Sequence, residues 1–202
     1  MVMLEILPIG EVQRSWLKYL RYELTEYFDD ILISSPVELP ITLNNNRQVM
    51  ADYVLDYLAS HSTQATRVLA VLNQDITVRS VDYIFGLAEL GGRNAIISPV
   101  RLREKYYNRE CDCDIFLERF LKEALHELGH TLGLGHCSND ICNMKFSSTV
   151  EEVDNKSIFF CSSCIERING YAHVENSKIY AANGDGRKSM VKLVIECLKN
   201  LK

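Results

Sequence analysis

The sequence lacks an excess of basic residues. Its 202 residues include 22 Lys and Arg against 27 Asp and Glu, which gives a net charge of -5 at pH 7. The densest basic stretch, RLREKYYNRE at 101–110, also contains acidic residues. A surface that follows the phosphates of a nucleic acid needs clustered Lys and Arg side chains. We therefore expect no nucleic-acid partner.

The sequence also lacks a long apolar segment. No stretch approaches the roughly 18 uninterrupted apolar residues that a membrane-spanning helix needs. Residues 1–12, MVMLEILPIGEV, are apolar but contain Glu5 and Pro8, and they show neither a basic start nor a small-residue cleavage site. We expect a β-strand here and not an export signal. We accordingly expect a cytoplasmic monomer without a membrane partner.

The spacing of apolar residues predicts an α/β domain. A length of 202 residues suits one domain, and 47% of hydrophobic residues can form a continuous core. Apolar runs predict strands, and apolar residues at three- and four-residue steps predict amphipathic helices. The predicted order β-α-β-α-β consists of strands at 3–9, 30–39 and 67–76 and helices at 11–28 and 47–61.

The middle of the chain predicts a hairpin and a long helix. Two apolar stretches, 82–90 and 94–102, flank Gly91-Gly92, so one of these strands should run antiparallel to the others. A helix is expected at 114–134. Further along, the expected elements are a short helix at 163–171, a strand-like piece within 177–189 and a terminal amphipathic helix at 190–202.

The densest cluster of reactive side chains is HELGHTLGLGHC, residues 126–137. His126 and His130 are four residues apart, so on a helix both imidazoles can face one ion. A catalytic zinc ion usually has three protein ligands and one open position. His136 can supply the third ligand if the helix ends first, which the intervening glycines permit. Glu127 is then placed to accept a proton from the water that the ion activates.

Four of the seven cysteines have the spacing of a second metal site. Cys137 and Cys142 form Cys-x4-Cys, and Cys161 and Cys164 form Cys-x2-Cys, as in structural zinc sites with four thiolates. Such a site can hold together a segment that has few aliphatic residues. The alternative is a pair of disulfides in an exported protein. Of the three other cysteines, those at 111 and 113 are expected to be free thiols or residues at the start of a helix, and the one at 197 a core residue.

The extended motif and the cysteines after it resemble the archaemetzincins, zinc metallopeptidases of the metzincin clan. The zinc motif runs directly into a cysteine and is followed by CNM at 142–144 and CSSC at 161–164. The resemblance covers roughly residues 67–170. It implies that the three histidines bind a catalytic zinc ion, that Glu127 is general base and acid, and that Met144 lies beneath the metal.

The resemblance also refines the expected fold. It implies a metzincin-like α/β (α+β) domain, with a twisted mixed five-stranded sheet, backing helices and an active-site helix. A single domain of residues 1–202 would comprise an N-terminal subdomain, 1–135, and a C-terminal subdomain, 136–202, held by the four-cysteine zinc site. Two zinc ions per chain follow, one catalytic and one structural.

The strand that binds substrate is also identified from the resemblance. In metzincins an antiparallel edge strand borders the cleft, and YIFGLAEL at 83–90 carries the aromatic-x-Phe-Gly run of the archaemetzincins. An edge strand exposes amide and carbonyl groups to which an extended peptide can add. Gly86 would permit close backbone approach, or alternatively mark a bulge. The expected substrate contacts are Phe85, Gly86, Leu87 and Ala88.

These features predict a zinc-dependent peptidase. The sequence shows no inhibitory prodomain before the fold, so we expect short peptides or chain ends as substrates. Aminopeptidase-like activity is what the resemblance implies. The alternative is a two-zinc binding or scaffold protein with little turnover, against which the presence of Glu127 argues, because a structural site needs no base. A secreted endoprotease with disulfides would require a signal peptide.

Overall fold

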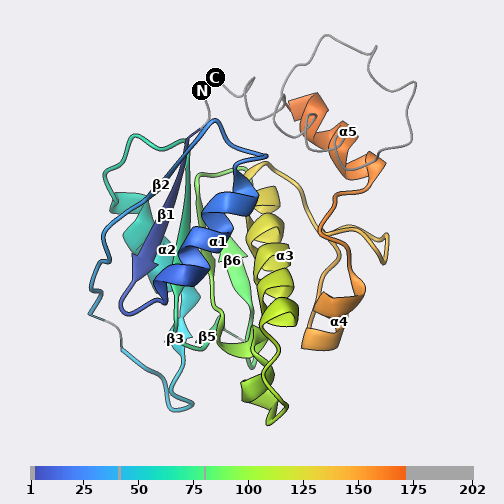
Figure 1. The fold of residues 1–202 in the computed structure, drawn as a ribbon. Helices are drawn as coiled ribbons and strands as arrows, with labels where there is room; N and C mark the ends of the chain where they lie inside the picture. The colour runs from blue at the N-terminus through green and yellow to red at the C-terminus, as the bar shows by residue number, and fades with distance from the viewer. Residues whose placement is uncertain (1–2, 41, 80, 172–202) are drawn as a thin grey trace.

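The structure is a computed structural model that describes residues 3–40, 42–79 and 81–171, without the side chains of 169–171 (Figure 1). The elements expected within 177–202 lie outside these residues. None of the described helices is both long and apolar enough to cross a membrane. The expected β-α-β-α-β order is confirmed by β1 (Met3–Ile9), α1 (Arg14–Leu24), β2 (Asp30–Ile33), α2 (Ala51–Ser60) and β4 (Arg67–Leu72).

A five-stranded mixed sheet forms the centre of the domain, in the order β2-β1-β4-β7-β6. The first four strands are parallel, and β7 (Asn94–Ile97) pairs with β4. β6 (Gly86–Ala88) runs antiparallel to β7 and lies at the edge. The expected antiparallel strand is therefore β6. A separate parallel ladder joins β3 (Val49–Met50) to β5 (Ile76–Thr77).

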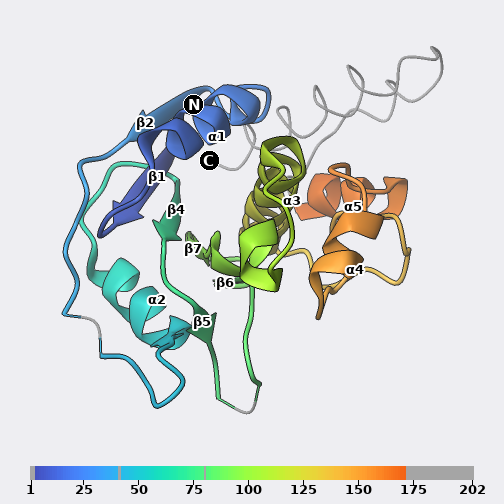
Figure 2. The same ribbon diagram turned by 60° about the horizontal axis from the view of Figure 1, so that its bottom comes forward.

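Side chains of the parallel strands alternate between two apolar cores, as the two-residue period of a strand requires. On β1, Leu4 and Ile6 belong to the core shared with α1 and the long helix α3 (Cys113–Thr131). Leu7 and Ile9 belong to the core shared with α2. Figure 2 shows α2 on one face of the sheet and α1 with α3 on the other. Both faces of the sheet are thus covered.

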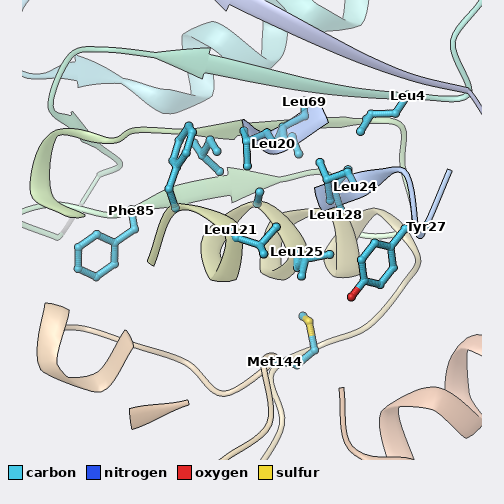
Figure 3. Packing of buried hydrophobic residues seen from close by; sticks show 14 of the residues in the cluster. Leu4, Leu20, Leu24, Tyr27, Leu69, Phe85, Leu121, Leu125, Leu128 and Met144 are labelled. Atoms are coloured by element: carbon cyan, nitrogen blue, oxygen red, sulfur yellow. The ribbon is translucent and has the colours of Figure 1, made fainter. Parts of the chain in front are cut away.

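α3 is the long helix expected at 114–134. Its N-cap is Asp112, whose side chain accepts hydrogen bonds from the amides of residues 114 and 115. Leu121, Leu125 and Leu128 pack into the core beside α1 (Figure 3). Packing of this apolar face fixes the rotation of α3 about its own axis. That rotation determines which side chains of the helix point into the cleft described below.

Four expected strands are shorter than predicted. The strand expected at 30–39 ends at Ile33, and the strand expected at 82–90 is only Gly86–Ala88. The strand expected at 94–102 ends at Ile97, because Pro99 cannot donate a ladder hydrogen bond, and a 3₁₀ helix follows at Val100–Leu102. The strand expected at 67–76 is divided, since β4 ends at Leu72 and Ile76 begins β5 in the other ladder. The four shortened strands, β2, β4, β6 and β7, all belong to the expected five-stranded sheet.

A small lobe made by residues 132–171 lies beside α3 (Figure 1). It contains α5 (Ser162–Tyr171), which agrees with the short helix expected there, and α4 (Val150–Asn155), which was not expected. α4 begins with a capping box: the Thr149 side chain accepts from the amide of Glu152, and the Glu152 carboxylate accepts from the amide of Thr149. This local signal could have identified the helix.

Candidate metal centres and cleft

α3 presents His126 and His130 one turn apart, with their Nε2 atoms 3.1 Å from each other. Their Nδ1 atoms lie 2.8 Å and 2.7 Å from the backbone oxygens of Asn143 and Leu134. A carbonyl oxygen only accepts, so each Nδ1 carries the hydrogen and each Nε2 offers a lone pair. Two lone pairs that face each other at this distance repel unless a cation lies between them.

A tetrahedral zinc ion fits this pair. Zinc bound at about 2.05 Å by two imidazoles holds their nitrogens about 3.3 Å apart, close to the spacing in the structure. Burial also lowers the pKa of His126 well below its usual range, with Lys156 and His130 adding to the effect, and burial likewise lowers the pKa of His130. Both rings are therefore neutral at pH 7, as metal binding requires.

His136 returns to the same point after α3 has ended at Thr131. Gly133 adopts a left-handed conformation, with φ of 83°, and so allows the chain to turn back. The His136 ring centroid lies 5.4 Å from that of His126 and 4.9 Å from that of His130. Nitrogen atoms of all three rings lie within 4.8 Å of one another. The structure thus brings the three expected ligands together.

Glu127 lies beneath β6 with its side chain buried. A Cβ placed on Gly86 would be only 2.5 Å from Glu127 Cγ and 2.6 Å from its Oε1, so the glycine makes room for the carboxylate. Pairing of β6 with β7 continues across Gly86 without a bulge. Burial raises the pKa of Glu127 well above its usual range, and the Glu123 charge adds to this while Lys156 opposes it.

A cleft of about 810 Å³ lies above α3, between β6 and residues 146–148. Its lining includes the three histidines, Glu127 and each of the expected strand residues Phe85, Gly86, Leu87 and Ala88. The amide of Ser98 donates to Phe85 O at 2.8 Å, and the amide of Glu89 donates to Asn94 O at 2.9 Å. Because antiparallel pairing alternates, the amide and carbonyl groups of Gly86 and Ala88 point to the free edge.

The four expected cysteines form a second cluster. Sγ of Cys137 lies 3.7 Å from Sγ of Cys161, and Cys142 and Cys164 are separated by the same distance. Zinc bound at about 2.3 Å by four thiolates holds the sulfurs about 3.8 Å apart, whereas a disulfide requires about 2.05 Å. All four thiols are free, and their sulfur atoms lie within 4.8 Å of one another. The donors fit a closed tetrahedral zinc site and not two disulfides.

The two clusters are joined through Met144. The amide of Cys137 donates to Met144 O at 2.8 Å, and the Met144 side chain is fully buried below α3 (Figure 3). A Cβ on Gly129 would lie 2.5 Å from Met144 Sδ. Gly129 therefore allows the methionine to approach the helix between the two histidine ligands. The sequence motif contains this glycine, but its contact with Met144 joins distant segments.

Sequence reasoning missed several polar residues around the site. Besides accepting from His126, Asn143 donates its side-chain amide to Lys122 O at 3.1 Å and to Ser157 O at 3.2 Å. It therefore ties α3 to the small lobe. Glu123 and Lys156 also line the cleft, as a buried ion pair. Of these residues, only Glu123 could have been predicted to lie near the site, because it is one helical turn before Glu127.

Comparison with known proteins gives a consistent result. A family model described as "Peptidase family M54" matches residues 31–170. An archaemetzincin of Methanocaldococcus jannaschii is 37% identical over 163 residues, which cover 81% of this chain and 90% of that protein. An archaemetzincin of Pyrococcus abyssi is 36% identical over 178 residues, with 83% and 95% covered.

Solved structures of archaemetzincins have the same fold. The structure from Archaeoglobus fulgidus, complexed with malonate, superposes with a TM-score of 0.71 at 31% sequence identity, covering 82% of this chain and 99% of that one. The structure from Methanopyrus kandleri gives a TM-score of 0.69 at 31% identity, covering 86% and 97%. The similarity extends over almost the whole length of these two relatives and over more than four fifths of this chain.

Proposed function

Because this chain belongs to peptidase family M54, the archaemetzincins, and is a zinc metallopeptidase, we propose that it cleaves short peptides or chain ends with Glu127 as the general base. The observation that carries the proposal is the convergence of the Nε2 lone pairs of His126 and His130, 3.1 Å apart, beside a buried carboxylate in an open cleft. A site with only a structural role would need neither the cleft nor the carboxylate.

His126, His130 and His136 would hold the catalytic ion. When bound, zinc supplies a Lewis acid that polarises a peptide carbonyl and makes a water molecule more acidic. The chain itself fixes the ligands, since backbone oxygens of Asn143 and Leu134 hold two of the rings in orientation. The ligand geometry is therefore set by the fold before a substrate arrives.

Glu127 would move the proton during hydrolysis. Its carboxylate accepts a proton from the attacking water and then delivers it to the amine that leaves. A general acid and base is most effective when its pKa lies near the working pH, and burial shifts the pKa of Glu127 upward from the ordinary range of a carboxylic acid. Gly86 leaves the space in which this side chain sits.

Two zinc ions per chain complete the proposal. Cys137, Cys142, Cys161 and Cys164 would bind the second ion in a closed, structural site. A structural zinc ion contributes folding free energy on the order of 10 kcal/mol. In this chain it would fix the segment that carries His136 and Met144, so the second ion would support the geometry of the first site.

Substrate would bind along the free edge of β6. The outward amide and carbonyl groups of Gly86 and Ala88 can pair with an extended peptide, and main-chain hydrogen bonds accept any sequence. We therefore propose broad side-chain tolerance along this strand. Removal of residues from the amino end of short peptides, an aminopeptidase-like activity, is the first form of the reaction to test.

A digest of a peptide library, with metal analysis of the same sample, tests the function. The wild-type protein should cleave peptides and bind zinc, whereas Glu127→Gln should keep its zinc and lose at least a thousandfold in kcat, because it keeps every ligand but lacks the base. The matched control, Glu118→Gln on the exposed side of α3, should cleave as the wild type does. A zinc-loaded wild-type protein without turnover would favour a zinc-binding scaffold.

A further inference from the structure

A buried ion pair that the proposed mechanism does not use lies in the cleft. Glu123 is on α3, one turn before Glu127, and Lys156 is the C-cap residue of α4. Lys156 Nζ lies 2.7 Å from Glu123 Oε1, and the two side chains are only 1% and 4% exposed. Both residues line the cleft. Isolated charges are rarely buried this deeply unless they are paired or bind something.

The pair has unused hydrogen-bonding capacity. Within the part of the chain that the structure describes, neither Lys156 Nζ nor Glu123 Oε1 has a hydrogen-bond partner beyond their mutual contact at 2.7 Å. Ser147 Oγ, which also belongs to a residue of the cleft lining, is likewise buried without a partner. An ammonium group offers three donors, and a carboxylate accepts at two oxygens. The residues that line the cleft therefore include buried donors and acceptors whose hydrogen-bonding capacity is not filled by the described chain.

The alignment of β6 with α3 places this pair in the cleft. Gly86 lies against Glu127, and the amide of Gly91 donates to His130 O at 2.9 Å, so strand and helix run in the same direction. Glu123 precedes Glu127 and therefore lies toward Tyr83. The Tyr83 hydroxyl donates to Ser148 O at 2.6 Å and bounds that end. The ion pair is thus on the floor of the cleft, between Glu127 and Tyr83.

We propose that Glu123 and Lys156 select the substrate side chain next to the cleaved bond, on the Tyr83 side, and that they favour a carboxamide, Gln or Asn. This inference rests on the proposed peptidase function. A peptide paired with β6 and cleaved at the histidines places that side chain over the ion pair. Its amide oxygen accepts from Lys156, and its amide nitrogen donates to Glu123.

Charge explains why a carboxamide is preferred to other side chains. The pair has no net charge, so a cationic or anionic side chain gains from one member and is repelled by the other. An aliphatic side chain would cover both charges without supplying a hydrogen bond, which is unfavourable for buried polar groups. A carboxamide is the neutral side chain that matches a donor and an acceptor at once.

A peptide library that varies only this position measures the selectivity. Hydrogen bonds to charged groups correspond to a preference of about tenfold or more, so Gln and Asn should exceed Leu by at least that factor in kcat/KM. Removal of one partner alone would leave a buried unpaired charge. The informative variant is therefore the double substitution Glu123→Leu with Lys156→Met, which should prefer Leu and Phe.

A matched control comes from another ion pair on α3, between Glu118 and Lys122. Lys122 is also buried, and its Nζ lies 2.8 Å from Glu118 Oε1, but neither residue belongs to the cleft lining. Glu118→Leu with Lys122→Met should therefore keep the wild-type ranking of side chains. This control shows whether a changed preference results from the loss of any ion pair on α3 or specifically from the change in the cleft lining.

The outcomes distinguish this inference from the function on which it rests. A wild-type protein that cleaves no peptide would overturn the peptidase function and this inference with it. A wild-type protein that cleaves but prefers Leu over Gln and Asn would overturn the inference alone, without any variant. A folded double variant that retains the carboxamide preference would overturn it as well.

Discussion

Gly86 of β6 and Glu127 of α3 are in such close contact that a Cβ on the glycine would lie 2.5 Å from Glu127 Cγ. The glycine is at a regular strand position, opposite Ile97, and not in a turn. Its lack of a side chain is therefore explained by the neighbouring helix and not by backbone conformation. The contact couples the proposed substrate strand directly to the proposed catalytic carboxylate.

Gly86→Ala should reduce peptide hydrolysis by at least tenfold in kcat. The methyl group would force Glu127 to rotate from its position beneath β6, because its Cγ, Cδ and Oε1 all lie within 3 Å of the added atom. No zinc ligand is altered, so metal content should remain at the wild-type level. Steady-state kinetics with metal analysis tests this, and an unchanged kcat in a fully folded variant would contradict the proposed role of the contact.

The two proposed zinc ions should leave the protein in a fixed order. The three-histidine site has an open position and lines a cleft, so a mild chelator should remove its ion first and leave the fold intact. Loss of the four-cysteine ion should unfold the small lobe, because Cys142 and Cys164 are part of its buried core.

Metal analysis and circular dichroism during chelation would follow both steps. His130→Ala should reduce the zinc content from two to one per chain, while Cys164→Ser should lose the other ion and lower the melting temperature. A wild-type protein with one zinc ion and two disulfides, detected by mass spectrometry, would disprove the second site.

Glu5 should make stability depend on pH. This carboxylate is buried in β1, where it accepts from Ser34 Oγ at 2.5 Å and lies 3.1 Å from His61 Nε2. Burial raises the pKa of Glu5, but hydrogen bonds from Ser34, Thr63 and His61 outweigh this and lower it overall. Because the pKa is lower in the folded chain, ionised Glu5 stabilises the fold above about pH 4.5, and that stability is lost as the pH falls through the folded value.

Glu5→Gln should therefore reduce the free energy of unfolding by about 1–3 kcal/mol at neutral pH, and by less as the pH falls below about 4.5. Denaturant titrations at several pH values measure the difference. Glu11→Gln, at an exposed position, should have almost no effect at any pH. A destabilisation by Glu5→Gln that does not vary with pH would contradict the assignment.

Sequence spacing could predict both clusters of metal ligands because the constraints on them are local. Four residues on a helix place His126 and His130 on one face, and the glycines that follow allow His136 to return. The same holds for Cys137 with Cys142 and for Cys161 with Cys164. Apolar periodicity predicted the β-α-β-α-β order, and the hairpin at Gly91-Gly92 predicted an antiparallel strand. The five-stranded mixed sheet and its edge strand at 83–90 followed from the resemblance to metzincins.

Contacts between distant segments could not be predicted in this way. Lys156 reaches Glu123 only because α4 packs beside α3, and no spacing of residues indicates that arrangement. Asn143 supports His126 from a loop position directly after Cys142, a member of the cysteine cluster. Burial of these polar groups is a property of the assembled fold, so it is visible in the structure and not in the sequence.

Proline substitutions at two neighbouring positions of β6 should distinguish substrate binding from pairing within the sheet. The amide of Ala88 points to the free edge, whereas Leu87 pairs with Ile96 of β7. Ala88→Pro removes one donor available to a bound peptide, so KM should rise about two- to tenfold, with zinc content and kcat little changed. Leu87→Pro instead removes a hydrogen bond within the sheet and should lower the melting temperature. Kinetics and thermal denaturation of both variants provide the test.

A folded Ala88→Pro protein with the wild-type KM for every peptide that it cleaves would refute binding along β6. A peptide paired with this edge would necessarily lose the hydrogen bond from the amide of Ala88.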